Sequence, residues 1–169
     1  MALIKSISGI RGTIGGKPGE SLTAIDVVKF TAAYGNIIAE RREDKSQPAK
    51  VVVGRDGRIS GEMVSQLVVY TLVSLGMDVI DLGFSTTPTV EIATKLEKAD
   101  GGIIITASHN AKEWNALKLL NGEGEFIDAE VGTEVLSRAK SEQLGFAIVD
   151  KLGTVTKNDS YLQKHIDLV

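Results

Sequence analysis

The chain has 169 residues, of which 43% are hydrophobic and 24% are charged, and its formal net charge is −3. These values are typical of a single soluble globular domain that buries a core and folds alone. The absence of cysteine excludes a disulfide framework and a thiolate metal site, and it agrees with a prediction of cytoplasmic localisation. The sequence has no long basic stretch, no secretory leader pattern and no apolar run of roughly 20 residues, so we expect neither nucleic acid nor a membrane as partner.

Three short apolar runs rich in valine and isoleucine predict buried strands. They span residues 50–53, 78–82 and 102–106. None of them alternates cleanly between apolar and polar residues, which is the pattern expected of strands covered on both faces.

Segments with helical periodicity separate these runs. They predict helices over about residues 24–42, 61–75 and 87–98, with Thr23 as the N-cap of the first and Thr87, followed by proline, as the N-cap of the third. The alternation of strands and helices implies crossover connections between parallel strands. We therefore predict an α/β fold, a three-layer α/β/α sandwich with a mainly parallel (mixed) sheet.

The C-terminal third predicts a hairpin followed by helices. Residues 116–120 and 125–127 read as two short strands, and Asp128 caps a helix that extends to about residue 139. We assign residues 1–155 to one domain and residues 156–169 to the start of a linker helix. Because the chain ends on apolar residues in a helical pattern, we interpret it as a truncated protein.

Polar and glycine-rich segments carry the chemistry. Thr106–Asn110 (Thr-Ala-Ser-His-Asn) follows the third predicted strand, and Gly54–Arg58 (Gly-Arg-Asp-Gly-Arg) follows the first. In an open parallel sheet, ligands bind beyond the carboxyl ends of the strands, so we expect both segments at one edge. Ser8–Gly12 (Ser-Gly-Ile-Arg-Gly) is interpreted as a third loop, whose glycines would let the backbone turn sharply and approach an anion closely.

These three segments, together with Thr86–Thr89 and Asn115–Lys118, resemble the first domain of the α-D-phosphohexomutase family of phosphoglucomutases, phosphomannomutases and phosphoglucosamine mutases. The segments occur in the order and at the spacing of the family, and the resemblance covers nearly the whole chain. Two positions depart from the family pattern: Ala111 stands where proline is common, and Ala116 stands where glycine is frequent. These changes affect loop geometry and remove no reacting group.

The resemblance implies that Ser108 is phosphorylated and that the protein interconverts hexose or hexosamine 6-phosphate and 1-phosphate through a bisphosphate intermediate. Such transfer depends on positioning and on cations that spread the charge of the phosphoryl group. Arg11 and Lys118 would supply positive charge, and Lys118 would also exchange a proton with the sugar hydroxyl. His109 would bind or orient the phosphoryl group or the reacting hydroxyl.

Further residues and partners are implied in the same way. Asn110, Asn115, Arg55 and Arg58 would support the loop or the substrate. The resemblance implies Mg²⁺ bound to the Ser108 phosphate, a hexose 1,6-bisphosphate activator and a phosphosugar substrate. The other Mg²⁺ ligands and the sugar recognition would belong to domains II–IV, which 169 residues cannot contain. We therefore predict that the isolated chain folds but does not catalyse the mutase reaction.

Structural explanations remain open for the same residues. The serine loop could be a simple polar turn, since serine and asparagine favour turns. Asp56 is expected to belong to an ion-pair cluster that fixes its loop, Arg11 could be a solvated surface residue, and Lys118 could be an ordinary solvent-facing strand residue. Trp114 is expected to be a packing residue.

Two other functions are alternatives to a phosphohexomutase. A free-standing, non-catalytic module that binds anions or phosphosugars would keep the fold without catalysing the mutase reaction. A serine hydrolase would need an acid behind His109, and Ser108 lacks the Gly-x-Ser-x-Gly pattern of that class. The sequence leaves open which sugar phosphate is used and which oligomeric state is formed.

Overall fold

The computed structural model describes residues 1–6 and 9–169, and within these ranges seven strands form one mixed sheet in the order β1-β2-β6-β5-β3-β4-β7. The strands are β1 (Leu3–Ser6), β2 (Gly9–Thr13), β3 (Lys50–Arg55), β4 (Asp78–Phe84), β5 (Gly101–Ile105), β6 (Trp114–Leu120) and β7 (Val155–Lys157). The helices are α1 (Ala24–Arg41), α2 (Gly61–Ser74), α3 (Thr87–Leu96), α4 (Ala129–Ser141) and α5 (Tyr161–Leu168), with a 3₁₀ turn at Val149–Lys151.

The sheet has a parallel half and an antiparallel half. β5, β3, β4 and β7 run parallel to one another, whereas β6 pairs antiparallel with both β5 and β2, and β1 pairs antiparallel with β2. β3 lies between β4 and β5, so the chain leaves β3 to build one side of the sheet and returns to build the other. This reversal is a topological switch point, because the chain after β3 leads to β4 on one side and the chain after β5 leads to β6 on the other.

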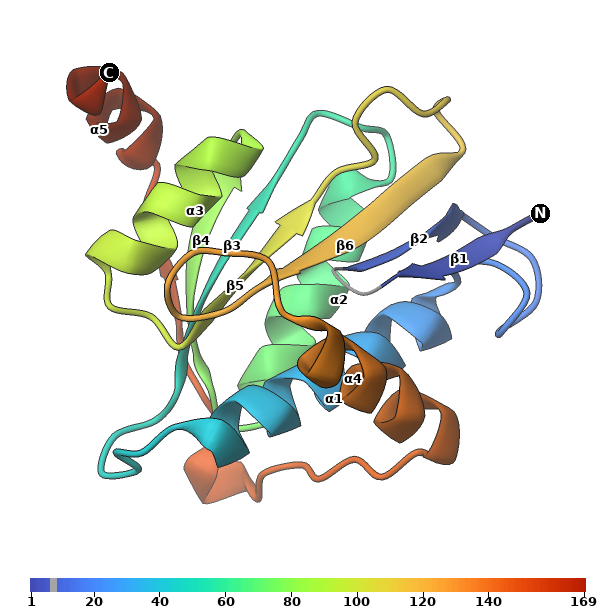
Figure 1. Ribbon diagram of the computed structural model, residues 1–169, viewed down its shortest axis with the longest axis horizontal. Coiled ribbons are helices and arrows are strands. Elements are labelled where there is room, and N and C mark those ends of the chain that lie inside the picture. Colours follow the sequence, from blue (N-terminus) through green and yellow to red (C-terminus); the bar gives the residue numbers. More distant parts are fainter. Residues whose placement is uncertain (7–8) are drawn as a thin grey trace.

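Helices cover both faces of the sheet, which confirms the predicted three-layer α/β/α fold (Figure 1). Val51 and Val53 of β3 pack into a large core with α1, α2 and α4, whereas Val52 packs into a second core with α3 and Tyr161 of α5. This alternation is the two-residue period of a strand covered on both sides.

The second face is only partly covered among the described residues. α3 contacts β3 and β5, while no described helix lies over β1, β2 and β6 on this face (Figure 1). The register pairs Ile4 with Arg11 and Arg11 with Ala116. Lys118 lies two residues after Ala116 in β6, so Arg11 and Lys118 share one face of the sheet. The open half-face therefore presents two cations beside the carboxyl edge of the parallel strands.

Most predicted elements are confirmed within a few residues, and the capping box of Thr23 at the start of α1 is present. The predicted N-cap at Thr87 was wrong: Thr86 is the N-cap of α3, and its hydroxyl accepts from the backbone N–H of Thr89. The predicted strand at residues 125–127 was also wrong, because only a single bridge joins Phe126 to Leu120.

The N-terminal glycine segment, predicted as a loop, forms strand β2 over its described residues. Its glycines allow close strand packing: a Cβ on Gly12 would lie 2.7 Å from the carbonyl oxygen of Ala2, and a Cβ on Gly9 would collide with the carbonyl oxygen of Leu117. Ser8, the first residue of that motif, lies outside the described residues.

Candidate active site

The serine loop lies at the switch point, directly after β5. Ser108 is exposed and has a φ of +54°, in the left-handed region that residues with a Cβ seldom occupy. The neighbouring loop after β3 is tied to the same edge, because the N–H of Asp56 donates to the carbonyl of Ile105 at 3.1 Å. The two segments that the sequence placed at one edge are therefore adjacent.

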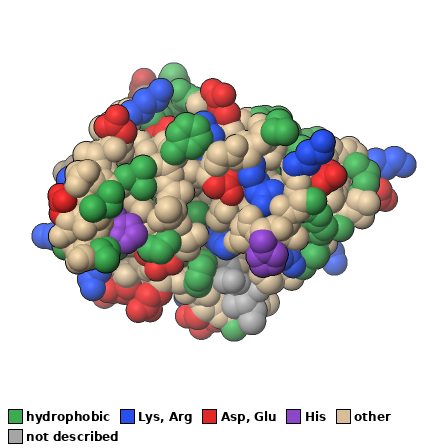
Figure 2. All heavy atoms as spheres, turned by 90° about the horizontal axis from the view of Figure 1, so that it is seen from above, with side chains coloured by type: hydrophobic (Ala, Val, Ile, Leu, Met, Phe, Trp, Pro, Cys, Tyr) green, Lys and Arg blue, Asp and Glu red, His purple; other side chains and the backbone are tan. Residues whose placement is uncertain are grey.

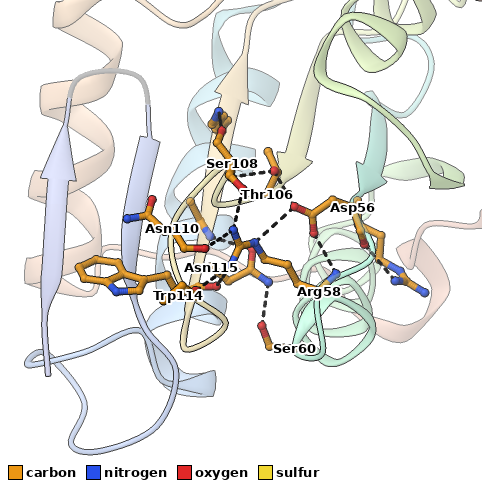
Figure 3. A network of polar contacts seen from close by, with 12 residues as sticks. Asp56, Arg58, Ser60, Thr106, Ser108, Asn110, Trp114 and Asn115 are labelled. Atoms are coloured by element: carbon orange, nitrogen blue, oxygen red, sulfur yellow. Dashed lines mark hydrogen bonds and ion pairs between the residues drawn. The ribbon is translucent and has the colours of Figure 1, made fainter.

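Asp56 and Thr106 link the two loops (Figure 3). The Thr106 hydroxyl donates to the Asp56 carboxylate at 2.7 Å and accepts from the backbone N–H of Ser108 at 3.1 Å. The other carboxylate oxygen of Asp56 accepts from the N–H of Arg58 at 3.2 Å. Both carboxylate oxygens of Asp56 thus accept hydrogen bonds from residues of the two loops, as expected of a structural residue. The guanidinium of Arg58 also points toward the serine loop, where it donates to the carbonyl of Ser108 (Figure 3).

Lys118 reaches Ser108 from the open half-face. Its Nζ donates to the Ser108 Oγ at 3.1 Å. Both residues line a hollow of about 320 Å³, a volume at the lower end of small-ligand sites. Arg11 and His109 line the same hollow, and no described aspartate or glutamate does. The hollow therefore favours an anion.

Arg11 lies beside the serine loop without being buried. Its guanidinium lies 5.7 Å from the centre of the Trp114 ring, and its Nη1 is 3.5 Å from the side-chain oxygen of Asn110. Stacking on an aromatic face holds an arginine in place while its N–H groups stay available. Trp114 is therefore more than a packing residue, because its ring supports the Arg11 guanidinium at the edge of the hollow.

Two other expected residues lie away from the Ser108 oxygen. Arg55 stacks on the Phe84 ring at 4.3 Å and lines a separate hollow of about 370 Å³. Asn115 is buried and donates to the Ser60 hydroxyl at 2.9 Å, which ties the start of β6 to the start of α2. The structure brings Ser108, His109, Lys118 and Arg11 together and leaves Arg55 and Asn115 outside the group.

Some contributors had little signal in the sequence. Thr106 was noticed only as part of a motif, although its hydroxyl connects both loops. Ile4 and Phe126 also line the hollow, and their positions depend on pairing between distant segments. Figure 2 views this end of the molecule and shows lysine and arginine atoms near the centre of the surface, with both histidines reaching it.

A larger hollow of about 520 Å³ lies at the opposite edge of the sheet. Its lining mixes cations such as Arg42 and Lys98 with carboxylates such as Asp100 and Asp128. Arg42 and Asp100 pair with each other at 3.5 Å. Because this edge holds the amino ends of the parallel strands and none of the loop motifs, its size does not make it the better candidate.

Comparisons with known proteins identify the family of this chain. Residues 3–146 match the family model described as phosphoglucomutase/phosphomannomutase, alpha/beta/alpha domain I. The chain belongs to the phosphoglucomutase/phosphomannomutase family. A phosphoglucomutase/phosphomannomutase of Thermococcus kodakarensis is 39% identical over 150 residues, which are 88% of this chain and 32% of that protein. A phosphoglucosamine mutase of Lacticaseibacillus casei is 38% identical over 123 residues, 72% of this chain and 27% of that protein.

Solved structures show the same fold. A phosphoglucomutase/phosphomannomutase family protein of Burkholderia thailandensis superposes with a TM-score of 0.75 at 24% identity, over 95% of this chain and 35% of that one. The chain thus spans about a third of the length of its relatives. As a family domain I, it carries its serine loop at the switch point of the sheet.

Within residues 1–6 and 9–169, no group of three or more histidines, aspartates and glutamates is arranged to hold a metal ion. Mg²⁺ prefers six oxygen ligands, so these residues alone do not fit that ion. In the same ranges, no helix combines the length and the apolar character needed to span a bilayer.

Proposed function

We propose that this chain is the phosphoryl-carrying domain of a mutase that interconverts hexose or hexosamine 6-phosphate and 1-phosphate, with Ser108 as the phosphorylated residue. The observation that carries the proposal is the 3.1 Å hydrogen bond from Lys118 to the Ser108 Oγ inside a cationic hollow. A nucleophile beside a proton-exchanging group, at an anion-binding edge, is what phosphoryl transfer requires.

The chain's residues allow a balanced step. The phosphoryl group passes from the Ser108 oxygen to a sugar hydroxyl: the bond between phosphorus and Oγ breaks and a bond to the hydroxyl oxygen forms. Lys118 delivers a proton to Oγ and receives the proton of the hydroxyl, so no proton is gained or lost. The bisphosphate then returns its other phosphoryl group to Oγ by the reverse step, while Arg11 and Lys118 offset the roughly −1.5 to −2 charge of the phosphoserine.

In this proposal, the metal ligands and the groups that recognise the sugar lie outside this chain. A Mg²⁺ ion would supply charge compensation, but the described residues do not fit it, and we derive no step through it. Relatives are about three times longer, and we infer that their further domains supply the metal ligands and the sugar recognition. The isolated chain is therefore expected to fold without mutase turnover.

Mass spectrometry of the full-length parent protein tests the phosphoserine. After incubation with a hexose 1,6-bisphosphate and Mg²⁺, we expect one added phosphate that maps to Ser108, is absent in Ser108→Ala and persists in the control Ser137→Ala. An unlabelled Ser108, under conditions that label an established mutase, would reject the mechanism. Phosphosugar binding without labelling would then support the non-catalytic module.

Lys118 is tested separately. Lys118→Met removes the nitrogen that donates to Oγ and keeps a side chain of similar length, so labelling of Ser108 should slow by about 10²-fold or more. Lys112→Met, at an exposed loop position, is the control. Equal labelling rates for the two variants would show that Lys118 is an ordinary strand residue.

A further inference from the structure

The guanidinium of Arg58 is enclosed by the backbone of the loop that carries Ser108 (Figure 3). Its Nη2 donates to the carbonyls of Ser108 and Asn110, both at 2.7 Å. Its Nη1 donates to the carbonyls of Ala111 at 2.8 Å and Trp114 at 3.2 Å. One side chain therefore binds four carbonyls distributed over the seven residues from 108 to 114.

These contacts use the N–H groups of Arg58 that would otherwise be available to bind a substrate. A guanidinium carries five N–H groups, and the four on its terminal nitrogens are matched by the four carbonyls. The fifth, on Nε, lies 3.4 Å from the Asp56 carboxylate, and the side chain is only 12% exposed. Arg11, in contrast, is exposed at the rim of the hollow.

We propose that Arg58 is a positioning residue: it sets the conformation of the loop over residues 108–114, and thereby the direction of the Ser108 Oγ, without contacting the substrate. The proposal rests on the proposed function and adds to it the device that orients the nucleophile. Ser108 needs such a device because its backbone is in the left-handed region, which is disfavoured for a residue with a Cβ.

The geometry also indicates why an arginine is required. A lysine would keep the positive charge, but its single nitrogen cannot reach four carbonyls at once. Arg58→Lys is therefore the informative variant, because it removes the planar fork and keeps the charge.

A matched control exists at the opposite edge of the sheet. Arg42 is 15% exposed, donates to the carbonyl of Gln47 at 2.6 Å and lies 3.5 Å from Asp100. Arg42→Lys thus removes an equally buried guanidinium with a carboxylate partner, far from the serine loop. Any effect seen in both variants reports general stability, and circular dichroism verifies that both are folded.

The first experiment needs no enzymatic activity. Amide hydrogen exchange and ¹⁵N relaxation are measured by NMR on the 169-residue chain. We expect the amides of residues 108–114 to exchange about tenfold faster in Arg58→Lys and to become more mobile, with no such change in Arg42→Lys. Loop amides in Arg58→Lys that match the wild type would overturn the proposal.

The second experiment measures single-turnover labelling of Ser108 by a hexose 1,6-bisphosphate in the full-length parent. Misplacement of a reacting group by about 1 Å costs about 10²-fold, so Arg58→Lys should lose that much of its maximal rate. The half-saturating concentration should stay within about threefold, and added guanidinium should restore part of the rate of Arg58→Ala.

A raised half-saturating concentration with an unchanged maximal rate would identify Arg58 as a substrate ligand and reject the positioning role. If the wild type is never labelled, the phosphoserine mechanism fails, while the NMR comparison still decides whether Arg58 orders the loop. The two failures are therefore distinguishable.

Discussion

Replacement of Thr106 by valine tests whether the hydroxyl between the two loops holds the site together. The substitution keeps the branched shape and removes a donor to the Asp56 carboxylate and an acceptor for the Ser108 N–H. Thr106 is only 9% exposed, so the valine methyl occupies the same space and water does not readily replace the lost hydroxyl.

The magnitude follows from these two bonds. A hydrogen bond to a charged group contributes about 1.5–3 kcal/mol, and one between neutral groups contributes about 0.5–1.5 kcal/mol. The Asp56 side chain is 29% exposed and Ser108 is exposed, so solvent recovers part of both. We expect the free energy of unfolding to fall by about 1.5–3 kcal/mol, which corresponds to a drop in Tm of about 3–12 °C for a chain of this size.

Urea unfolding of the 169-residue chain, followed by circular dichroism, measures this quantity. Thr156→Val is the control, because it makes the same chemical change at an exposed position of β7 and should alter stability by less than about 0.5 kcal/mol. If Thr106→Val differs from this control by less than about 0.5 kcal/mol, the hydroxyl does not hold the loops together and the reasoning is refuted.

Two further predictions concern packing and pH. Gly102→Ala places a Cβ 2.5 Å from the Thr94 hydroxyl, between β5 and α3, so urea unfolding should show a loss of stability of about 1–3 kcal/mol. Thr94→Ala should relieve part of this loss, and purely additive effects of the two substitutions would contradict the clash. Gly57→Ala is the control and should have little effect, because a Cβ there meets no atom within 4 Å. Arg138 binds the carboxylate of Glu40 at 2.7 Å and lowers its pKa below the usual 4.5, so this stabilisation is present above that pH and is lost as the pH falls through the lowered pKa. The stability difference between wild type and Arg138→Gln should be under about 1 kcal/mol, because the Glu40 side chain is 57% exposed and solvent screens the pair. This difference should shrink between about pH 5 and 3 and with added salt, and a difference independent of pH would exclude the pairing.

The parallel half of the fold and the position of the serine loop were predictable from the sequence. The Val- and Ile-rich runs are β3, β4 and β5, and Thr23 and Asp128 cap the helices that were expected to begin there. These features depend on local periodicity and capping chemistry, which act over a few neighbouring residues. Because parallel strands place their carboxyl ends at one edge, the sequence also predicted that the Ser108 loop and the Arg58 loop lie at the same edge. That they are neighbours depends on the pairing of β3 with β5 in the fold.

The antiparallel half could not be predicted in this way. Gly9–Thr13 is a strand because it pairs with Trp114–Lys118 across about a hundred residues of sequence, and its glycines fit that pairing rather than a turn. β7 has only three residues and exists through its pairing with β4. A short strand of this kind has no periodicity of its own and is stabilised by its neighbour.

The roles of the two arginines in the Gly54–Arg58 segment were likewise decided by tertiary structure. The sequence offers Arg55 and Arg58 with equal claims to the substrate or to the loop. In the fold, Arg55 stacks on Phe84, while Arg58 meets four carbonyls of the Ser108 loop. Local sequence determines where a strand ends and a loop begins, but the partners that a side chain finds there arrive from β4, β5 and β6, and only the folded chain brings those segments together.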